Sequence, residues 1–292
     1  MTLMKLVAFS SDIYEPTTYD EAVKALTTGD PNVKPLAGGT WIMRSTLRKE
    51  HPAATYVPLG GLTQLASLKS GENIELGASL THADIAKGLP QDKSLDVLRQ
   101  AAGNSANPSI RNMATLGGNL ATDEFSAADL VPALLCLDAD VTLATAKGEI
   151  ALPLSEYLQR RMDLKSKTLV TGVQIPQSRE DSFSAHARIT MRRNGGDYPV
   201  GIISLFFELN EESLVSGIRV AVGSVEKTAR RWTELEDALM GQPLEANHAS
   251  QISAGLTSTL NARDDGGSSA WYRREIVPSL VRRAVLSAIR TD

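Results

Sequence analysis

Two pairs of adjacent glycines, far apart in the chain, are the candidate ligand-binding residues of this sequence. They lie in Ala37-Gly38-Gly39-Thr40 and in Thr115-Leu116-Gly117-Gly118-Asn119. Adjacent glycines adopt backbone angles closed to other residues, and no side chain covers their amide N–H groups. Amides that point into one concavity bind anionic oxygens without a lysine. Two such loops that face each other could hold a diphosphate from both sides.

Each glycine pair, taken alone, also fits a simpler structural role. A Gly-Gly pair most often marks a tight turn, and Gly60-Gly61 and Gly266-Gly267 are predicted to be turns only. The chain has no GxGxxG motif after a strand and no GxxxxGK motif followed by serine or threonine. The two commonest glycine-rich phosphate sites are therefore absent. At this point a turn and a phosphate loop both remain open interpretations of each pair.

The cysteine and the histidines exclude several kinds of redox and metal site. Cys136 is the single cysteine, so it cannot form an internal disulfide or hold an iron–sulfur cluster or a structural zinc alone. It lies in an apolar run and is predicted to be a small core residue. The histidines His51, His82, His186 and His248 show no paired-ligand spacing, so no metal site is predicted. Redox chemistry in this chain would therefore need an organic cofactor.

The bulk properties are those of a folded soluble protein. Hydrophobic residues make up 42% of the 292 residues, and the formal net charge of -4 gives no reason to expect nucleic acid or an anionic membrane as a partner. The longest strongly apolar stretch, 200–207, is too short to cross a bilayer. The first ten residues lack the pattern of a cleaved signal. We expect a cytoplasmic protein without a membrane span, although export as part of a complex on a partner's signal stays open.

The pattern along the chain predicts three regions, 1–58, 59–176 and 177–292. In the first, Thr18 and Glu21 have capping-box spacing at the start of a short helix. In the second, alternating apolar residues predict strands at 73–78 and 140–145, and helical spacing predicts a helix over 94–102 that stops at Gly103. The connector that begins at Ile175 leads to strands at 201–209 and 218–222 and to helices at 232–240 and 277–289. Strands followed by helices indicate an α+β unit, and 264–269 is expected to be a flexible loop.

Several motifs, in the same order as in a known family, give this chain a specific resemblance. Residues 36–40 and 111–121 resemble the two flavin signatures of the p-cresol methylhydroxylase-type FAD domain. More narrowly, they are similar to the medium subunit of carbon monoxide dehydrogenase and to the FAD domain of xanthine dehydrogenase. Residues 128–139 and the C-terminal segment 268–274 are also similar to segments of that family. The resemblance covers nearly the whole chain.

The resemblance implies both a fold and a domain organisation. The fold is α+β: a two-subdomain p-cresol methylhydroxylase-type FAD-binding domain, then an antiparallel sheet with helices of the carbon monoxide dehydrogenase flavoprotein type. The two FAD-binding subdomains are expected at 1–58 and 59–176, and the C-terminal flavoprotein domain at 177–292. The relatives that carry a cysteine-ligated 4Fe-4S insertion differ from this chain, which has one cysteine.

The resemblance also implies which residues contact FAD. The stretch 35–41 is expected to wrap the diphosphate, and the stretch 115–119 to close on it from the other side. Asp129 is expected to contact the adenosine portion. Tyr198, in Gly196-Asp197-Tyr198, is expected near the isoalloxazine ring, and Arg188 is expected to face the flavin. Ala102 and Gly103 match a segment beside the flavin, and Trp41 stands where many members have aspartate or asparagine. The full expected set is Pro35, Leu36, Ala37, Gly38, Gly39, Thr40, Trp41, Ala102, Gly103, Thr115, Gly117, Gly118, Asn119, Thr122, Asp129, Ile175, Arg188 and Tyr198.

The function that the resemblance implies is electron transfer. In the family, a large subunit holds the molybdenum cofactor, a small subunit holds 2Fe-2S clusters, and the flavin subunit passes electrons from the clusters to an external acceptor. By this resemblance the chain binds FAD non-covalently, needs no catalytic base of its own and works in a dimer of heterotrimers. The substrate belongs to the molybdenum subunit, so this sequence specifies neither substrate nor acceptor.

Two other interpretations stay open from the residues. One is a free-standing FAD-dependent oxidase of the same superfamily. No histidine or cysteine is expected beside the glycine loops, which argues against the covalent kind. The other is a binding module that has lost FAD, although both glycine pairs are intact.

Overall fold

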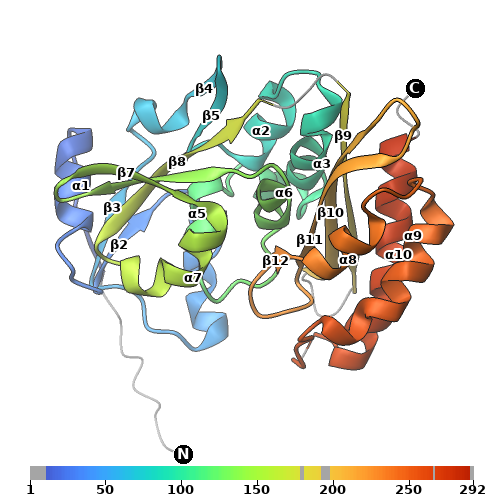
Figure 1. Cartoon of the computed structure of the whole chain (residues 1–292). Coiled ribbons are helices and arrows are strands. Elements are labelled where there is room, and N and C mark those ends of the chain that lie inside the picture. Colours follow the sequence, from blue (N-terminus) through green and yellow to red (C-terminus); the bar gives the residue numbers. More distant parts are fainter. Residues whose placement is uncertain (1–10, 178–180, 192–197, 266, 290–292) are drawn as a thin grey trace, which may run out of the picture.

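Three β-sheets with helices packed around them make up the structure, a computed structural model that describes residues 11–177, 181–191, 198–265 and 267–289 (Figure 1). The first two sheets and the third occupy opposite halves of the molecule (Figure 1). This mixture of sheets and helices confirms the α+β class predicted from the sequence. In the part of the chain that the structure describes, no helix is long and apolar enough to cross a membrane.

The first sheet has three parallel strands in the order β1-β3-β2. Helix α1 covers it, and Ala22 and Leu26 of this helix pack in one cluster with Val57. The bounds here are β1 (Asp12–Ile13), α1 (Tyr19–Leu26), β2 (Val33–Leu36), the short helix η1 (Ile42–Arg48) and β3 (Thr55–Pro58). Strand β2 therefore delivers the chain directly to the first glycine pair.

The start of α1 agrees with the sequence in part. The Thr18 hydroxyl accepts a hydrogen bond from the Glu21 amide (3.2 Å), as predicted for the cap. The Glu21 carboxylate, however, accepts from the Thr17 amide (2.7 Å), so the reciprocal half of the capping box does not form at Thr18.

The second sheet has five antiparallel strands in the order β4-β5-β8-β6-β7. The strands predicted by alternation are present as β5 and β6, and Ile74, Leu76, Val141 and Leu143 are buried as expected. The bounds are β4 (Leu68–Ser70), β5 (Asn73–Gly77), β6 (Asp140–Thr145), β7 (Gly148–Pro153) and β8 (Thr168–Pro176).

Short helices connect these strands and carry the second glycine pair. They are η2 (Thr63–Ala66), α2 (His82–Gly88), η3 (Lys93–Leu95), α3 (Asp96–Asn104), α4 (Pro108–Arg111), α5 (Leu116–Ala121), α6 (Leu130–Cys136) and α7 (Leu154–Leu164). Helix α3 runs through Gly103 instead of stopping there, because Gly103 does not adopt the positive φ of a terminating glycine. Cys136 is fully buried in α6, as predicted.

The third sheet is antiparallel, in the order β12-β11-β10-β9, and it is covered on both faces. Helices α8, α9 and α10 cover one face, where Phe207 and Val220 are buried. Helices α3 and α6 of the preceding region cover the other, where Phe206 and Ala221 join their core. The bounds are β9 (Ser182–Thr190), β10 (Pro199–Leu209), β11 (Val215–Gly223), β12 (Arg230–Arg231), α8 (Thr233–Leu239), α9 (Ala246–Leu256), η4 (Thr257–Thr259) and α10 (Ala270–Ile289).

The C-terminal helices differ from the sequence prediction in extent. Helix α10 begins at Ala270, not near Val277, because buried Arg273 and Ile276 pack its first turns against the sheet although Pro278 lies inside the helix. The loop before it is held, not free: the Asp265 carboxylate accepts from Arg273 Nη2 (2.8 Å) and from the Ser268 amide (3.1 Å). Tertiary contacts thus decide where this helix starts.

Candidate functional site

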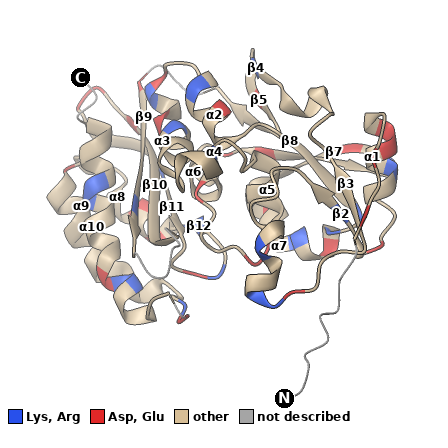
Figure 2. Ribbon diagram, turned by 180° about the vertical axis from the view of Figure 1, so that it is seen from behind, with Lys and Arg blue, Asp and Glu red and all other residues tan. Residues whose placement is uncertain are grey.

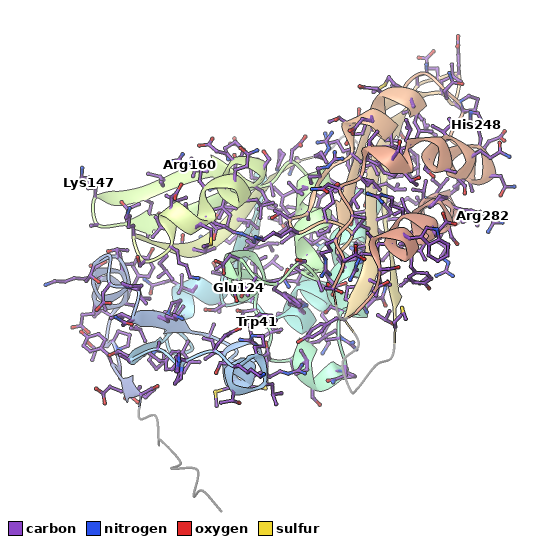
Figure 3. All side chains as sticks on the ribbon, turned by 90° about the horizontal axis from the view of Figure 1, so that it is seen from below. Trp41, Glu124, Lys147, Arg160, His248 and Arg282 are labelled. Atoms are coloured by element: carbon purple, nitrogen blue, oxygen red, sulfur yellow. The ribbon has the colours of Figure 1, made fainter. Side chains whose placement is uncertain are left out.

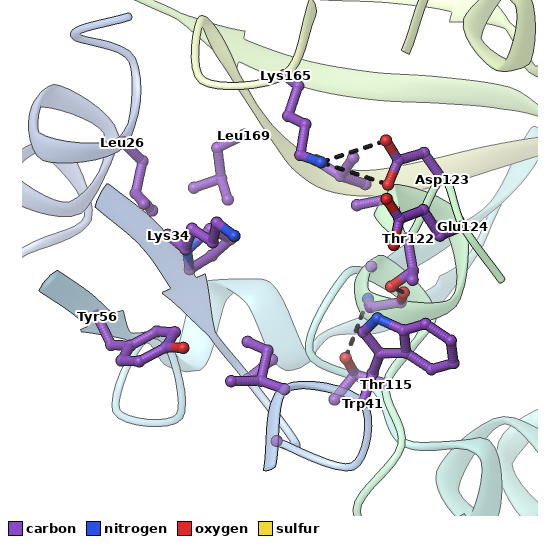
Figure 4. Close-up of a pocket in the computed structure, with 18 of the residues that line it drawn as sticks. Leu26, Lys34, Trp41, Tyr56, Thr115, Thr122, Asp123, Glu124, Lys165 and Leu169 are labelled. Atoms are coloured by element: carbon purple, nitrogen blue, oxygen red, sulfur yellow. Dashed lines mark hydrogen bonds and ion pairs between the residues drawn. The ribbon is translucent and has the colours of Figure 1, made fainter. Parts of the chain in front are cut away.

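A cavity of about 510 Å³ lies where the first sheet meets the second, and both glycine pairs line it (Figure 4). Seen from below, Trp41 and Glu124 of its wall lie near the middle of the molecule, whereas Lys147, Arg160, His248 and Arg282 lie at the periphery (Figure 3). Its volume falls in the range of about 300–1,000 Å³ usual for small-molecule and cofactor sites. The site is therefore large enough for a sizeable organic ligand.

The first glycine pair presents unused amides to this cavity. A Cβ on Gly38 would lie 1.6 Å from the Met113 carbonyl oxygen, and Gly39 has φ +67°, so both positions require glycine. Among the described residues, no group accepts a hydrogen bond from the amides of Gly38, Gly39 or Thr40. Such unpaired backbone donors along a cavity wall are suited to anionic oxygens. The sequence interpretation of this pair as a phosphate loop agrees with this geometry.

The second glycine pair is built differently. Thr115 caps helix α5, and its Oγ accepts from the Gly118 amide (3.2 Å), while the Gly117 amide donates to the Ala78 carbonyl (2.8 Å). A Cβ on Gly117 would lie 2.9 Å from the Ala78 Cβ. The expectation that this pair also bares its amides is wrong, because helix formation and close packing use them. What the loop offers is the Thr115 hydroxyl hydrogen, which no described residue accepts.

Charged side chains of both signs surround the cavity. Lys165 Nζ pairs with an Asp123 carboxylate oxygen at 3.2 Å (Figure 4), and Arg48 pairs with Glu50, whose pKa it lowers. Arg161 is buried, and it donates to the backbone carbonyl of Asp123 (3.0 Å) just past α5. Burial lowers the pKa of the Arg161 guanidinium. This arginine thus fixes the segment that follows the second glycine pair.

A second cavity, of about 140 Å³, adjoins the first and shares Thr40, Trp41 and Thr115 with it. Aromatic rings line one side: the ring centroids of Trp41 and Phe125 are 4.9 Å apart, and those of Phe125 and Tyr198 are 5.3 Å apart. Arg44 Nη1 donates to the Tyr198 hydroxyl (3.0 Å). The two cavities therefore adjoin at Thr40, Trp41 and Thr115, which line both.

Asp129 lies in the small cavity and is nearly fully buried. Its carboxylate pairs with Arg188 Nε at 2.8 Å, and Arg188 Nη1 donates to the Asn104 carbonyl (2.7 Å). Asp129 does not cap α6; the Asn119 side-chain oxygen accepts from the Leu130 amide instead (3.2 Å). Asp129 and Tyr198 thus line the same small cavity, whereas the sequence had predicted Asp129 at the adenosine portion and Tyr198 near the ring.

The structure brings most of the other expected residues together. The large cavity is lined by Pro35, Ala37, Gly38, Gly39, Thr40, Trp41, Thr115, Gly117, Gly118 and Thr122. The small one is lined by Thr40, Trp41, Thr115, Asn119, Asp129, Arg188 and Tyr198. Leu36, Ala102, Gly103 and Ile175 line neither cavity.

The expected residues away from the cavities have other roles in the fold. Ala102 and Ile175 are fully buried in the core of the second region. Leu36 lies beneath Gly39, and Gly103 lies beside Ala86. Gly196 and Asp197, which were expected next to Tyr198, fall outside the described residues.

Sequence reasoning missed wall residues that come from other elements. Lys34, Tyr56, Arg161, Lys165 and Leu169 line the large cavity, and His82 and Phe125 line the small one. Leu169 lies at one end of β8 and the expected residue Ile175 at the other. The expected residue is therefore on a strand that borders the large cavity, although its own side chain does not line it. The remaining residues carry no motif, and only the tertiary fold brings them to the site.

Histidines also line the site, which corrects the expectation that none lies beside the glycine loops. His51 lines the large cavity and His82 the small one. The His82 amide donates to the Ala114 carbonyl (2.9 Å), directly before the second glycine loop. In the described part of the chain, no group of His, Cys, Asp or Glu side chains could hold a metal ion.

The C-terminal motif at 268–274 holds in place the strand that begins at the small cavity. Arg273 is 1% exposed, and its Nη1 donates to the carbonyls of Val200 (2.6 Å) and Ser224 (2.9 Å). The Ser224 hydroxyl in turn donates to the Pro199 carbonyl. Arg273 therefore fixes the start of β10, the strand that follows Tyr198.

Comparison with protein families accounts for both halves of the chain. Residues 8–178 match the FAD binding domain in molybdopterin dehydrogenase, and residues 186–288 match the CO dehydrogenase flavoprotein C-terminal domain. The first match alone covers more than half of the chain. The chain belongs to the FAD-binding subunits of the molybdopterin dehydrogenase family.

Individual relatives agree with this membership over their full length. The chain is 28% identical to the 6-hydroxypseudooxynicotine dehydrogenase complex subunit alpha of Paenarthrobacter nicotinovorans, with 96% of this chain and 95% of that one covered. It is 25% identical to the carbon monoxide dehydrogenase medium chain of Afipia carboxidovorans, with 96% and 97% covered. The CO dehydrogenase structure from Oligotropha carboxidovorans has the same fold, with a TM-score of 0.84 at 23% identity, covering 96% of this chain and 98% of that one.

The residues of this FAD-binding subunit fit the cofactor of its family. A diphosphate needs several hydrogen-bond donors, and the free amides of the first pair and the Thr115 hydroxyl supply them. A dinucleotide also needs room on both sides of its diphosphate, and the two cavities meet at Thr40 and Thr115. Aromatic rings along the small cavity suit the planar ring system.

Proposed function

We propose that this chain is the electron-transfer subunit of a molybdenum hydroxylase complex. It holds one FAD non-covalently, takes electrons from 2Fe-2S clusters of a small partner subunit and passes them to an external acceptor. The observation that carries the proposal is the first glycine loop, whose amides at Gly38, Gly39 and Thr40 bind no described residue and line a cavity of about 510 Å³. Clustered, unpaired donors of this kind are well suited to an anionic ligand.

FAD supplies the redox chemistry when bound, and the protein supplies binding and orientation. The first loop and Thr115 hold the diphosphate, and Arg161 keeps the segment after α5 in place through the Asp123 carbonyl. The larger cavity, with Tyr56 and Leu169 in its wall, takes the adenosine portion. Asp129, Arg188 and Tyr198 act at the ring end, in the small cavity. No side chain is required as a catalytic base.

The proposed partners are a large molybdopterin-binding subunit and the small 2Fe-2S subunit, in a dimer of heterotrimers. The relatives support this, because one is named as a subunit of a dehydrogenase complex and others as medium chains. Basic and acidic residues are interspersed along the ribbon (Figure 2), and the formal net charge is -4, so nucleic acid is not a proposed partner. We propose a cytoplasmic location for the complex.

Purification from the native host, without reductant, tests the proposal. We expect a flavin spectrum, release of the flavin by acid, and co-purification with a molybdenum subunit and a 2Fe-2S subunit. A flavin that stays attached to the denatured chain would contradict non-covalent binding. A flavin-containing lone chain that oxidises a small substrate would support a free-standing oxidase instead, and a colourless chain that resists reconstitution with FAD would overturn the proposal.

A further inference from the structure

His82 has an unusual position at the wall of the small cavity. It is the first residue of α2, it is 4% exposed, and its Nδ1 lies 2.6 Å from the Ser105 hydroxyl. Its other ring nitrogen, Nε2, is buried and has no hydrogen-bond partner in the described part of the chain. A buried polar atom without a partner is costly, so a native protein usually places one where a ligand or water completes it.

The hydrogen bonds around Ser105 determine which ring nitrogen of His82 carries the proton. The Ser105 hydroxyl donates its one hydrogen to the Ala102 carbonyl (2.9 Å). Its oxygen must therefore accept from the His82 ring, which places the hydrogen on Nδ1. Burial lowers the pKa of His82 to about 4, so the ring is neutral at pH 7. Nε2 consequently offers a lone pair and can only accept a hydrogen bond.

The charged groups around His82 do not change the neutral state of its ring, so Nε2 keeps its lone pair. Asp129 raises the pKa of His82 and Arg111 lowers it, and both effects are smaller than that of burial. The Asp129 carboxylate, another acceptor in the cavity wall, forms an ion pair with Arg188. An occupant of the small cavity must therefore bring a hydrogen-bond donor to Nε2.

We propose that His82 is a positioning residue for the flavin, and that its Nε2 accepts the hydrogen bond of the imide N–H of the isoalloxazine ring. This inference rests on the proposed FAD function. The oxidised ring has a single N–H group, which lies between two carbonyls. The small cavity shares Thr40 and Thr115 with the proposed diphosphate site, and the rings of Trp41, Phe125 and Tyr198 flank it. Its size admits the imide edge, which is where the donor lies.

His186 provides a matched control inside the same protein. It too is buried, its Nδ1 lies 2.9 Å from the Ser204 hydroxyl, and its Nε2 lies 3.8 Å from Asp129 Oδ1. Unlike His82, it does not line the small cavity. A change at His186 therefore reproduces the loss of a buried histidine without touching the proposed contact.

Two substitutions separate the ring nitrogens of His82. The amide of His82→Asn overlaps Nδ1 and can keep the Ser105 contact, but it removes the acceptor at Nε2. The longer amide of His82→Gln places an oxygen near the position of Nε2. The full chain, freed of cofactor, is reconstituted with FAD and with FAD methylated at the imide nitrogen, and both dissociation constants are measured from the change in flavin fluorescence.

We expect the wild-type chain to prefer FAD over the methylated form by about 5- to 100-fold, the range for an unsatisfied buried partner. His82→Asn should abolish most of this preference by weakening FAD alone, while His82→Gln and His186→Asn should keep it. If His82→Asn keeps the full preference, the proposal is overturned. If no variant and no wild-type chain binds FAD, the proposed function itself fails.

A measurement on the wild-type chain avoids the risk that a variant fails to fold. Ring ¹⁵N NMR of the cofactor-free chain should show His82 protonated at Nδ1 with Nε2 bare. Addition of FAD should move the Nε2 resonance of His82 and leave that of His186 in place. A proton on Nε2 in the cofactor-free chain, or no response to bound FAD, would rule out the proposed contact.

Discussion

The two glycine pairs look alike in the sequence but have different structural roles in the fold. Both contain a glycine that lets backbone approach closely: Gly38 against the Met113 carbonyl and Gly117 against Ala78. The first pair lies in a loop and leaves its amides unpaired, whereas the second lies in helix α5 and uses them. The same dipeptide therefore leaves its amides free in one place and allows close packing in the other.

The difference follows from the element that contains each pair. A helix consumes amides in its own hydrogen bonds and in its cap, so the second loop has only the Thr115 hydroxyl hydrogen to offer a ligand in the proposed site. A loop at the end of a strand has no such internal partners. Substitutions at the four glycines test this difference directly.

Gly38→Ala should have the largest effect, because its Cβ would lie 1.6 Å from a backbone oxygen that cannot move away easily. We expect a loss of at least about 3 kcal/mol in the free energy of unfolding and loss of bound FAD. Urea unfolding and flavin content measure both. Gly61→Ala is the control, since nothing lies within 4 Å of its Cβ position. Equal behaviour of the two variants would show that the first pair makes no close approach.

Acid should lower the free energy of unfolding through His82, whose amide binds the Ala114 carbonyl just before the second glycine pair. The pKa of buried His82 is lowered to about 4, below its ordinary value of 6.5. As pH falls from about 6.5 to 4, the unfolded chain binds a proton that the folded chain does not, so stability is full above pH 6.5 and falls by about 3 kcal/mol across this window. Urea midpoints against pH measure it. His82→Asn should flatten this part of the curve, and an unchanged slope would contradict the prediction.

Gly117→Ala should cost about 1–2 kcal/mol in stability. Its Cβ would lie 2.9 Å from the Ala78 Cβ and 3.1 Å from the Ala78 carbonyl oxygen, and the gain in helix propensity offsets only part of this crowding. Thermal unfolding measures the loss. If the second pair is a packing device, FAD affinity should fall only as far as the Thr115 hydroxyl is displaced, and less than in Gly38→Ala.

Gly39→Ala should cost about 1 kcal/mol, because φ +67° is unfavourable for alanine although no atom lies closer than 3.5 Å. Relief of this strain would turn the free amides away from the cavity. FAD affinity should therefore fall more than stability does, in contrast to Gly117→Ala. Titration calorimetry with FAD, beside thermal unfolding, decides between the two patterns.

Gly118→Ala should have the smallest effect. Its Cβ would lie 3.1 Å from the Thr115 Oγ, which is a side-chain atom able to shift slightly. The gain of about 0.5–1 kcal/mol from replacing glycine within a helix compensates for this. We expect unchanged stability and a few-fold weaker FAD binding, measured by flavin fluorescence. A large loss of affinity would mean that the Gly118 region itself holds the diphosphate.

Sequence patterns and the family resemblance were sufficient to predict the fold class and most of the expected residues that line the two cavities. The alternation of Ile74 and Leu76 and of Val141 and Leu143 predicted β5 and β6, because a half-buried strand must alternate. Local patterns failed where long-range packing decides. Helix α10 starts seven residues before Val277, and the side-chain function of Arg273 depends on Val200 and Ser224, far away in the chain.

The sequence was enough to select the two glycine pairs as candidates and, through the family resemblance, to name FAD as the expected cofactor. The fold settled which pair keeps its amides free and which positions require glycine, because both depend on the surrounding elements. It also placed Asp129 with Tyr198 and revealed His82 at the same cavity. A side chain's partner and protonation depend on burial and on contacts from distant elements, and a linear pattern does not contain them.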